Sequence, residues 1–249
     1  MLAGAINTTG AQDAQNRARP ADGGTREVLI SILIPSLANA PFTAIVNTEW
    51  IRLLADGSSI TLKNHRAIAR DKDGRIFQER QTLVPGQNRE NSTVSQIEIS
   101  DPVSHELIIC VPQELVCQVE DFFAPLEPPS PLAQPAQGPN STGIVDLGKR
   151  FIERLETIGR RETVTIPKGQ IGNNSPLLVK REYWYSPLLG INLSSSRSDP
   201  RFGTQNFEVT DVVIGEPDAK LFAVPSGSKM INLKSTVGTG EPQQAPQSN

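Results

Sequence analysis

The chain is dominated by short runs in which apolar and polar residues alternate, separated by turn residues. "FTAIVNTEWIRLL" (42–54) is followed by Asp56-Gly57, then by "SITLKNHRAIAR", and then by "DKDG" at 71–74 and "RIFQERQTLV". Asp-Gly steps between β-rich runs are strong signals for β-hairpins. Turn chemistry also explains the carboxylates of "DKDG" better than a calcium loop does, because the other oxygen donors of such a loop are missing. We therefore predict antiparallel strands joined by tight turns.

The same alternation continues to residue 123 and predicts a meander of about six strands with sequential neighbours. It resumes after residue 142 and predicts a second group of strands, a helical turn at 217–225 and a short closing strand at 228–233. Helical periodicity is nearly absent. The predicted fold class is all-β, mainly antiparallel, with a curved meander sheet and few short helices.

Composition divides the chain into three parts. Residues 1–25 and 235–249 are polar and lack periodicity, so we expect disordered termini. Residues 26–234 form a single predicted β-rich domain, which contains the connector 124–140 with its six prolines. The connector either joins two sheets or spans one. The apolar run at 28–34, before Ala38-Asn39-Ala40, superficially resembles a signal peptide, but Glu27 adjoins it and Pro35 interrupts it, which favours a strand of the mature protein.

The two cysteines, Cys110 and Cys117, are predicted to form a structural disulfide. A hairpin closed by the loop 112–115 places 111 opposite 116 and 110 opposite 117. In that register the Cα atoms are about 4.5 Å apart, which is within the disulfide range. The rival reading, a redox or metal pair, usually needs C-x-x-C with further Cys or His nearby. A disulfide indicates an exported protein, periplasmic or secreted.

Charge and motifs exclude several activities. The net charge of −3 and the scattered Lys and Arg give no basic surface for nucleic acid. No apolar run approaches the length of a membrane span. The sequence lacks G-x-S-x-G, H-E-x-x-H, phosphate-loop and dinucleotide motifs, and Ser226 in "SGSK" has none of the companion motifs of an S-x-x-K enzyme. His65 and His105 are far apart along the chain. We expect no catalytic residues, no metal and no cofactor.

Several blocks resemble a family of uncharacterised exported proteins from acidobacteria and related soil bacteria. The blocks include "NAPFTAIVNTEWIRLLADG", "ISDPVSHELIICVP", "IPKGQIGN", "WYSP" and "SDPRFG", and they cover most of 28–228. Where members often have Gly-Val, this chain has Arg154-Leu155. More distantly, the strand order resembles the half-barrel of periplasmic lipoprotein carriers (LolA-like) and of envelope-stress sensors. This second resemblance implies a half-barrel fold.

The aromatic residues supply the candidate binding site. In a strand, Tyr183 and Tyr185 point to one face and Trp184 to the other, so the three rings cannot form one platform. Trp184 and Trp50 either pack ordinarily or line the hollow of the curved sheet, where an apolar or lipid ligand would cover them. We therefore expect a non-catalytic binding or sensing protein of the bacterial envelope. The alternatives are a structural or protein-interaction module of the envelope, with an envelope protein as partner, and an enzyme of unknown type.

Overall fold

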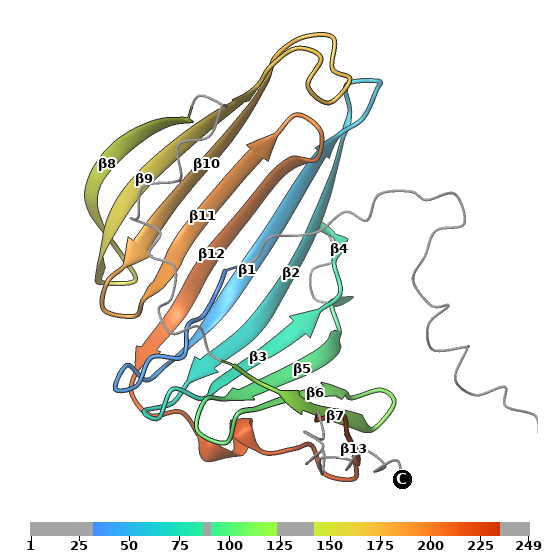
Figure 1. Cartoon of the computed structure of the whole chain (residues 1–249), viewed down its shortest axis with the longest axis vertical. Helices are drawn as coiled ribbons and strands as arrows, with labels where there is room; N and C mark the ends of the chain where they lie inside the picture. The colour runs from blue at the N-terminus through green and yellow to red at the C-terminus, as the bar shows by residue number, and fades with distance from the viewer. Residues whose placement is uncertain (1–31, 87–90, 124–141, 235–249) are drawn as a thin grey trace, which may run out of the picture. The chain divides into compact units, whose positions relative to one another are not determined.

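The structure, a computed structural model, describes residues 32–86, 91–123 and 142–234. Strands account for 61% of these residues and helices for 3%, and the strands form one large, mostly antiparallel sheet that is not closed into a barrel (Figure 1). The predicted all-β fold class is confirmed. The termini expected to be disordered (1–25, 235–249) and the proline-rich connector (124–140) lie outside the described residues. No helix in the described part is long and apolar enough to cross a membrane.

The first group of strands forms consecutive antiparallel hairpins, as the meander predicts. β1 pairs with β2, β2 with β3, β3 with β5, β5 with β6, and β6 with β7, while the short β4 pairs with β2. The turns after β1 and β2 lie at the two predicted Asp-Gly and "DKDG" positions. The strands are β1 (Phe42–Leu53), β2 (Ser59–Arg70), β3 (Ile76–Gln81), β4 (Val84–Pro85), β5 (Val94–Asp101), β6 (Glu106–Val111) and β7 (Val116–Asp121).

The second group extends the same sheet from its other end. β8 to β12 are again consecutive antiparallel neighbours, and β12 pairs with β1. The closing strand β13 runs parallel to β7. The resulting order is β13-β7-β6-β5-β3-β2-β1-β12-β11-β10-β9-β8, so strands on both sides of the connector belong to one sheet. The strands are β8 (Thr142–Ile152), β9 (Leu155–Ile166), β10 (Leu177–Ser186), β11 (Ile191–Asp199), β12 (Gly203–Ile214) and β13 (Lys229–Asn232).

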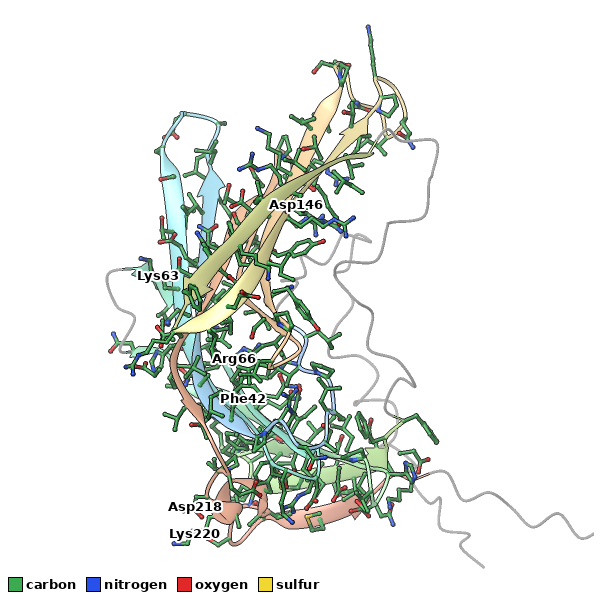
Figure 2. The ribbon with its side chains drawn as sticks, turned by 90° about the vertical axis from the view of Figure 1, so that its left-hand side faces the viewer. Phe42, Lys63, Arg66, Asp146, Asp218 and Lys220 are labelled. Carbon is green, nitrogen blue, oxygen red and sulfur yellow. A yellow bond between two sulfur atoms is a disulfide. The ribbon has the colours of Figure 1, made fainter. Side chains whose placement is uncertain are left out.

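The sheet has two faces, which we name after residues of β1. Phe42 and Val46 are fully buried on one face, the Phe42 face, and Glu49 points to the other, the Glu49 face. Directly opposed residues of antiparallel strands share a face, so the register extends both names across the sheet. On β2, Arg66 belongs to the Phe42 face and Lys63 to the Glu49 face (Figure 2).

Residues 32–40 lie over the Phe42 face and do not form a strand. The prediction of a strand is thus wrong for the described part of that run. Ile32 and Ile34 are buried, at 5% and 6% exposed, although none of the described strands pairs with them. The apolar side chains of this run therefore serve as a cover over the sheet, and the interruption at Pro35 explains why they do so without entering it.

Arg70, at the end of β2, fixes this cover. It is opposite Phe42, its guanidinium lies 5.1 Å from the Phe42 ring, and it is fully buried. Its three nitrogen atoms donate to the carbonyl oxygens of Ala40 (2.9 Å), Pro35 (2.9 Å) and Leu189 (2.8 Å). Burial lowers the pKa of Arg70 to about 10, so the side chain stays charged at neutral pH.

A second core lies on the Glu49 face of the first strand group. Ala69, Phe77 and Ile99 pack there with Phe222, which comes from the short 3₁₀ helix η2 (Ala219–Phe222). This helix confirms the predicted helical turn. The ring of Phe222 also lies 4.8 Å from the Arg75 guanidinium. The segment between β12 and β13 thus covers the sheet where β3 and β5 are most apolar.

The β8–β9 hairpin turns at Glu153 and Arg154, with φ of 49° and 64°. Two successive positive φ values are typical of a two-residue type I′ turn, for which Asn-Gly is the preferred sequence. Here neither residue is Asn or Gly. The departure from Gly-Val at Arg154-Leu155 therefore leaves the hairpin in place.

Candidate functional site

Trp50 lies on β1, on the Phe42 face, and is 7% exposed. Its indole nitrogen donates to the carbonyl oxygen of Phe202 at 2.7 Å, in the turn between β11 and β12. The guanidinium of Arg52 lies 5.1 Å from the centre of the ring. Both the polar edge and one contact surface of this ring are therefore occupied by the protein itself.

Trp184 lies on β10 and is 9% exposed. Its ring covers the backbone of Gly159 on β9, where an added Cβ would come within 2.5 Å of Cζ3. The guanidinium of Arg150, from β8, lies 3.8 Å from the centre of the ring. The indole nitrogen donates to the Glu182 carboxylate at 3.3 Å.

The register places the two tryptophans on opposite faces. Trp184 is opposite Ser194, which is opposite Glu208, which is opposite Asn47 on the Glu49 face. Trp50 belongs to the Phe42 face. The structure therefore does not bring the two rings together in one hollow. Tyr183, beside Trp184, lies on the Phe42 face. Its hydroxyl donates a hydrogen bond to the Glu162 carboxylate. Burial and this carboxylate raise the pKa of Tyr183 to about 12.

Cys110 and Cys117 are directly opposite in the β6–β7 hairpin, in the register that the sequence predicts. Their sulfur atoms are bonded, with the Cα atoms 4.0 Å apart, and both residues are buried. The bridge lies on the Glu49 face, because Cys110 is opposite Ile97 beside the second core. It pins the hairpin that pairs with β13.

The two histidines lie in different hairpins. His65 is on β2, and its buried Nδ1 has no hydrogen-bond partner among the described residues. His105 has a φ of 54° in the β5–β6 turn, and its ring lies 6.4 Å from that of Phe123. In the β2–β3 turn, the Asp71 carboxylate accepts from the backbone nitrogen of Arg75 at 2.8 Å and forms an ion pair with the Arg75 guanidinium. Among the described residues, no group of three or more His, Cys, Asp and Glu side chains is placed to hold a metal ion.

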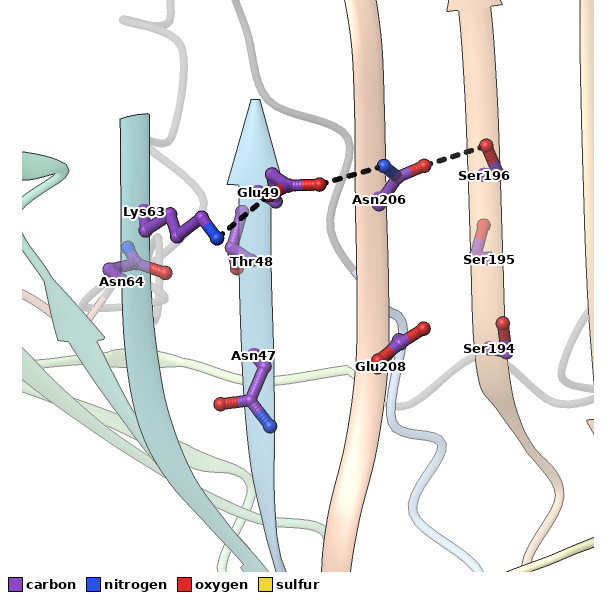
Figure 3. Close-up of a pocket in the computed structure, with 10 residues that line it drawn as sticks. All are labelled: Asn47, Thr48, Glu49, Lys63, Asn64, Ser194, Ser195, Ser196, Asn206 and Glu208. Carbon is purple, nitrogen blue, oxygen red and sulfur yellow. Dashed lines mark hydrogen bonds and ion pairs between the residues drawn. The ribbon is translucent and has the colours of Figure 1, made fainter. Parts of the chain in front are cut away.

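A polar groove of about 360 Å³ crosses β2, β1, β12 and β11 (Figure 3). It lies on the Glu49 face, where Lys63, Glu49, Asn206 and Ser196 are successive cross-strand neighbours. Its lining consists of amides, hydroxyls, two carboxylates and one ammonium group. The lining residues are Asn47, Thr48, Glu49, Lys63, Asn64, Ser194, Ser195, Ser196, Asn206 and Glu208.

A chain of hydrogen bonds runs along the groove. The Lys63 ammonium contacts one Glu49 oxygen at 2.9 Å, and the Asn206 amide nitrogen donates to the other at 3.2 Å. The Ser196 hydroxyl in turn donates to the Asn206 amide oxygen at 2.8 Å. The hydrogen bond from Lys63, with a smaller effect from Asn206, lowers the pKa of Glu49, so its carboxylate remains ionised at neutral pH.

Two lining groups remain available to a ligand. Glu208 is exposed, and neither its carboxylate nor the Ser194 hydroxyl forms a hydrogen bond with another described residue. Glu49 and Glu208 outweigh Lys63, so the lining carries a net negative charge. The lining contains no histidine or cysteine. The groove can therefore donate and accept hydrogen bonds and favours a neutral or cationic ligand over an anion.

A second hollow, of about 460 Å³, adjoins the groove at Ser196. Glu182 is one of its lining residues. The Glu182 carboxylate accepts two hydrogen bonds from the Arg161 guanidinium, at 2.9 and 2.8 Å, and one from the Trp184 indole nitrogen. Trp184 thus contributes to this surface by positioning a carboxylate. The lining residues are Arg161, Lys180, Glu182, Ser196 and Ser198.

Sequence reasoning missed this groove. The available signal is polar residues at every second position of four strands, such as Asn47 and Glu49 on β1 or Ser194 and Ser196 on β11. That alternation indicates only a solvated face. The groove becomes visible once β1 is known to pair with β12, because this pairing joins strands from the two ends of the chain.

No protein-family model matches the chain, and no curated protein matches it. The solved structures similar to it include an uncharacterized conserved protein of Thermus thermophilus, with 8% identity over 78% of this chain and 91% of that chain and a TM-score of 0.41. The MucA/MucB complex of Pseudomonas aeruginosa matches with 12% identity over 77% and 58% and a TM-score of 0.39. LprF from Mycobacterium bovis matches with 10% identity over 76% and 90% and a TM-score of 0.30. The resemblance to the family of exported proteins stays a prediction.

Proposed function

We propose that the chain is a non-catalytic binding protein of the bacterial envelope whose polar groove holds a hydroxyl-rich, neutral or amine-bearing ligand such as an oligosaccharide. The observation that carries this proposal is the row of hydrogen-bonded polar side chains across four strands, with Glu208 and Ser194 left available. Sugar hydroxyls donate to carboxylates and accept from amides and ammonium groups, which are the groups of this lining.

The disulfide between Cys110 and Cys117 supports export, because such bonds persist in oxidising compartments. An apolar or lipid ligand, expected from Trp50 and Trp184, stays a prediction. The protein's own groups already contact both rings, and the two residues are only 7% and 9% exposed. Fatty acid therefore belongs in the binding test as a competing probe.

The test compares four probes by NMR titration of the full chain: a neutral glucose trimer, a glucosamine trimer, a galacturonic acid trimer and lauric acid. The net negative lining predicts that the glucosamine trimer binds best and the galacturonic acid trimer worst, with shifts at the strands of the groove. Glu208→Gln should weaken the glucosamine trimer about tenfold and the neutral trimer less, because a charge-assisted hydrogen bond is lost. Glu156→Gln, an exposed carboxylate of β9 outside the groove, is the matched control.

Two results would overturn the proposal in different ways. The absence of binding by every sugar, with lauric acid binding instead, would favour the apolar ligand. Carboxylate pairs also serve glycosidases, so each trimer is recovered and analysed after incubation. Cleavage that disappears in Glu208→Gln would make the groove an active site and end the non-catalytic assignment.

A further inference from the structure

β8 forms one end of the sheet and exposes several apolar side chains. It pairs with β9 on one side, and no described strand pairs with its other side. Three of its apolar side chains are exposed: Ile144 at 40%, Val145 at 50% and Phe151 at 72%. A long edge strand with exposed apolar side chains is a ready template for pairing with another strand.

A β-bulge sets which side chains of β8 share a face. The register with β9 shifts between Asp146 and Gly148, where Leu147 is the extra residue. Asp146 and Lys149 are opposite Arg160 and Ile158, which are two residues apart on β9 and so point the same way. Without the bulge, residues three apart would point to opposite faces. The bulge thus aligns Ile144, Asp146, Lys149 and Phe151 on one face.

This order of side chains is self-complementary. When a second β8 is placed antiparallel with the two bulges side by side, Asp146 lies opposite Lys149 of the second copy. In the same register, Ile144 lies opposite Phe151 of the second copy. A twofold axis through the bulge produces each of these pairs twice, as an isologous contact requires. Opposite charges and apolar side chains directly across a strand pair are both stabilising.

The existing contacts leave room for these pairs. One Asp146 oxygen accepts from the Gly148 backbone nitrogen at 2.7 Å, which leaves the other for a partner. Lys149 contacts Glu156 of its own chain at 2.9 Å, with 63% of its side chain exposed, and an ammonium group has two further donors. On the opposite face, Val145 would meet the stem of Arg150 of the second copy.

We propose that β8 pairs antiparallel with β8 of a second copy, forming a symmetric dimer with one continuous sheet. The interface is independent of the polar groove, because none of the groove's lining residues lies on β8. Failure of the dimer would therefore leave the proposed ligand untouched, and failure of ligand binding would leave the dimer untouched.

Analytical ultracentrifugation of the full chain over a wide concentration series tests the proposal. The wild type should dimerise. Asp146→Lys and Lys149→Asp each place like charges across the interface twice, and each should raise the dissociation constant about tenfold or more. The double variant Asp146→Lys/Lys149→Asp restores opposite charges and should recover most of the wild-type affinity. Glu156→Gln is the control for the loss of the contact between Lys149 and Glu156.

A cross-link tests the register separately. Leu147 lies beside the twofold axis, so Leu147→Cys should form an intermolecular disulfide on oxidation. Val145 of one copy lies several residues along the strand from Val145 of the other, so Val145→Cys should not form one. Circular dichroism confirms that each variant is folded. Three results would overturn the proposal. The wild type could be a monomer, or it could form a dimer that neither single charge reversal weakens. The third result is a dimer that is cross-linked through Val145→Cys and not through Leu147→Cys.

Discussion

At the residue scale, the burial of Trp184 depends on a missing side chain. The ring occupies the space in which residue 159 would carry its Cβ, and the Arg150 guanidinium lies 3.8 Å from the centre of the ring. Alternation along "REYWYS" correctly separates Trp184 from its two tyrosine neighbours. It gives no information on what each side chain meets, because a cross-strand partner comes from another part of the chain.

Gly159→Ala should displace this ring. An added methyl group would lie 2.5 to 2.7 Å from three ring carbons, and the backbone of β9 leaves it no alternative position. We expect the free energy of unfolding to fall by about 2 kcal/mol through overpacking. The intrinsic fluorescence should also shift to longer wavelength as the ring becomes exposed.

Urea unfolding followed by tryptophan fluorescence measures both effects. The matched control is Gly143→Ala on β8, where the nearest atom to an added Cβ, Thr163 Cβ, is 3.9 Å away. If Gly159→Ala behaves like this control, the ring has more freedom than the packing implies.

At the element scale, the residues of a turn decide whether its hairpin can be predicted from the sequence. The turns at Asp56-Gly57 and at 71–74 were predicted from their residues and lie where expected. The Glu153-Arg154 turn has the backbone of an Asn-Gly turn without its residues, so no local signal marks it. It forms because β8 and β9 pair on both sides of it, and tertiary pairing cannot be deduced from two residues.

The β11–β12 turn carries a pH-dependent interaction. The Asp199 side chain is 1% exposed and accepts from Arg201 at 2.9 and 2.7 Å and from Arg197 at 3.3 Å. The hydrogen bonds from Arg201 are the main reason why the pKa of Asp199 is lowered. Because the pKa of this carboxylate is lower in the folded state, its interactions stabilise the fold fully at pH values above the pKa of an unfolded aspartate, about 3.9. This stabilisation is lost as the pH falls through the pKa of the folded state.

Asp199→Asn should therefore lower the free energy of unfolding by about 2 kcal/mol at pH 7. The difference from the wild type should shrink as the pH falls below about 4, where the carboxylate becomes protonated in the unfolded chain, and should be smallest below the lowered pKa of the folded state. Urea unfolding at pH 7 and pH 3 measures this, with Glu114→Gln in the exposed β6–β7 turn as a control that changes little at either pH. An equal loss at both pH values would mean that packing, and not charge, stabilises this turn.

At the scale of the whole molecule, the pairing of β1 with β12 joins the two groups of strands into one sheet. Local patterns predict hairpins, and these hairpins account for the two groups of strands on either side of the connector. The β1–β12 register pairs residues such as Thr48 and Phe207, which are far apart in the sequence, and no local pattern specifies it. The polar groove spans this junction, so it could not be predicted either.

Arg70 provides a second link between the two groups. Its guanidinium holds carbonyl oxygens from the segment 32–40 and from the β10–β11 turn against the end of β2. The fully buried Arg70 guanidinium and the three carbonyl oxygens satisfy one another's hydrogen bonds. Removal of the guanidinium should therefore affect distant parts of the chain at once.

Arg70→Met keeps much of the side-chain volume but leaves three carbonyl oxygens without their donor, so the free energy of unfolding should fall by about 3 kcal/mol. Arg181→Met, on the exposed surface of β10, should change it by less than about 0.5 kcal/mol. Hydrogen exchange locates the effect: the amides of Leu37 and Gly190, which donate to Pro35 and Ser186, should both lose protection in Arg70→Met. If only one of the two amides were affected, Arg70 would anchor a single segment, and the two groups of strands would be joined by β1 and β12 without its help.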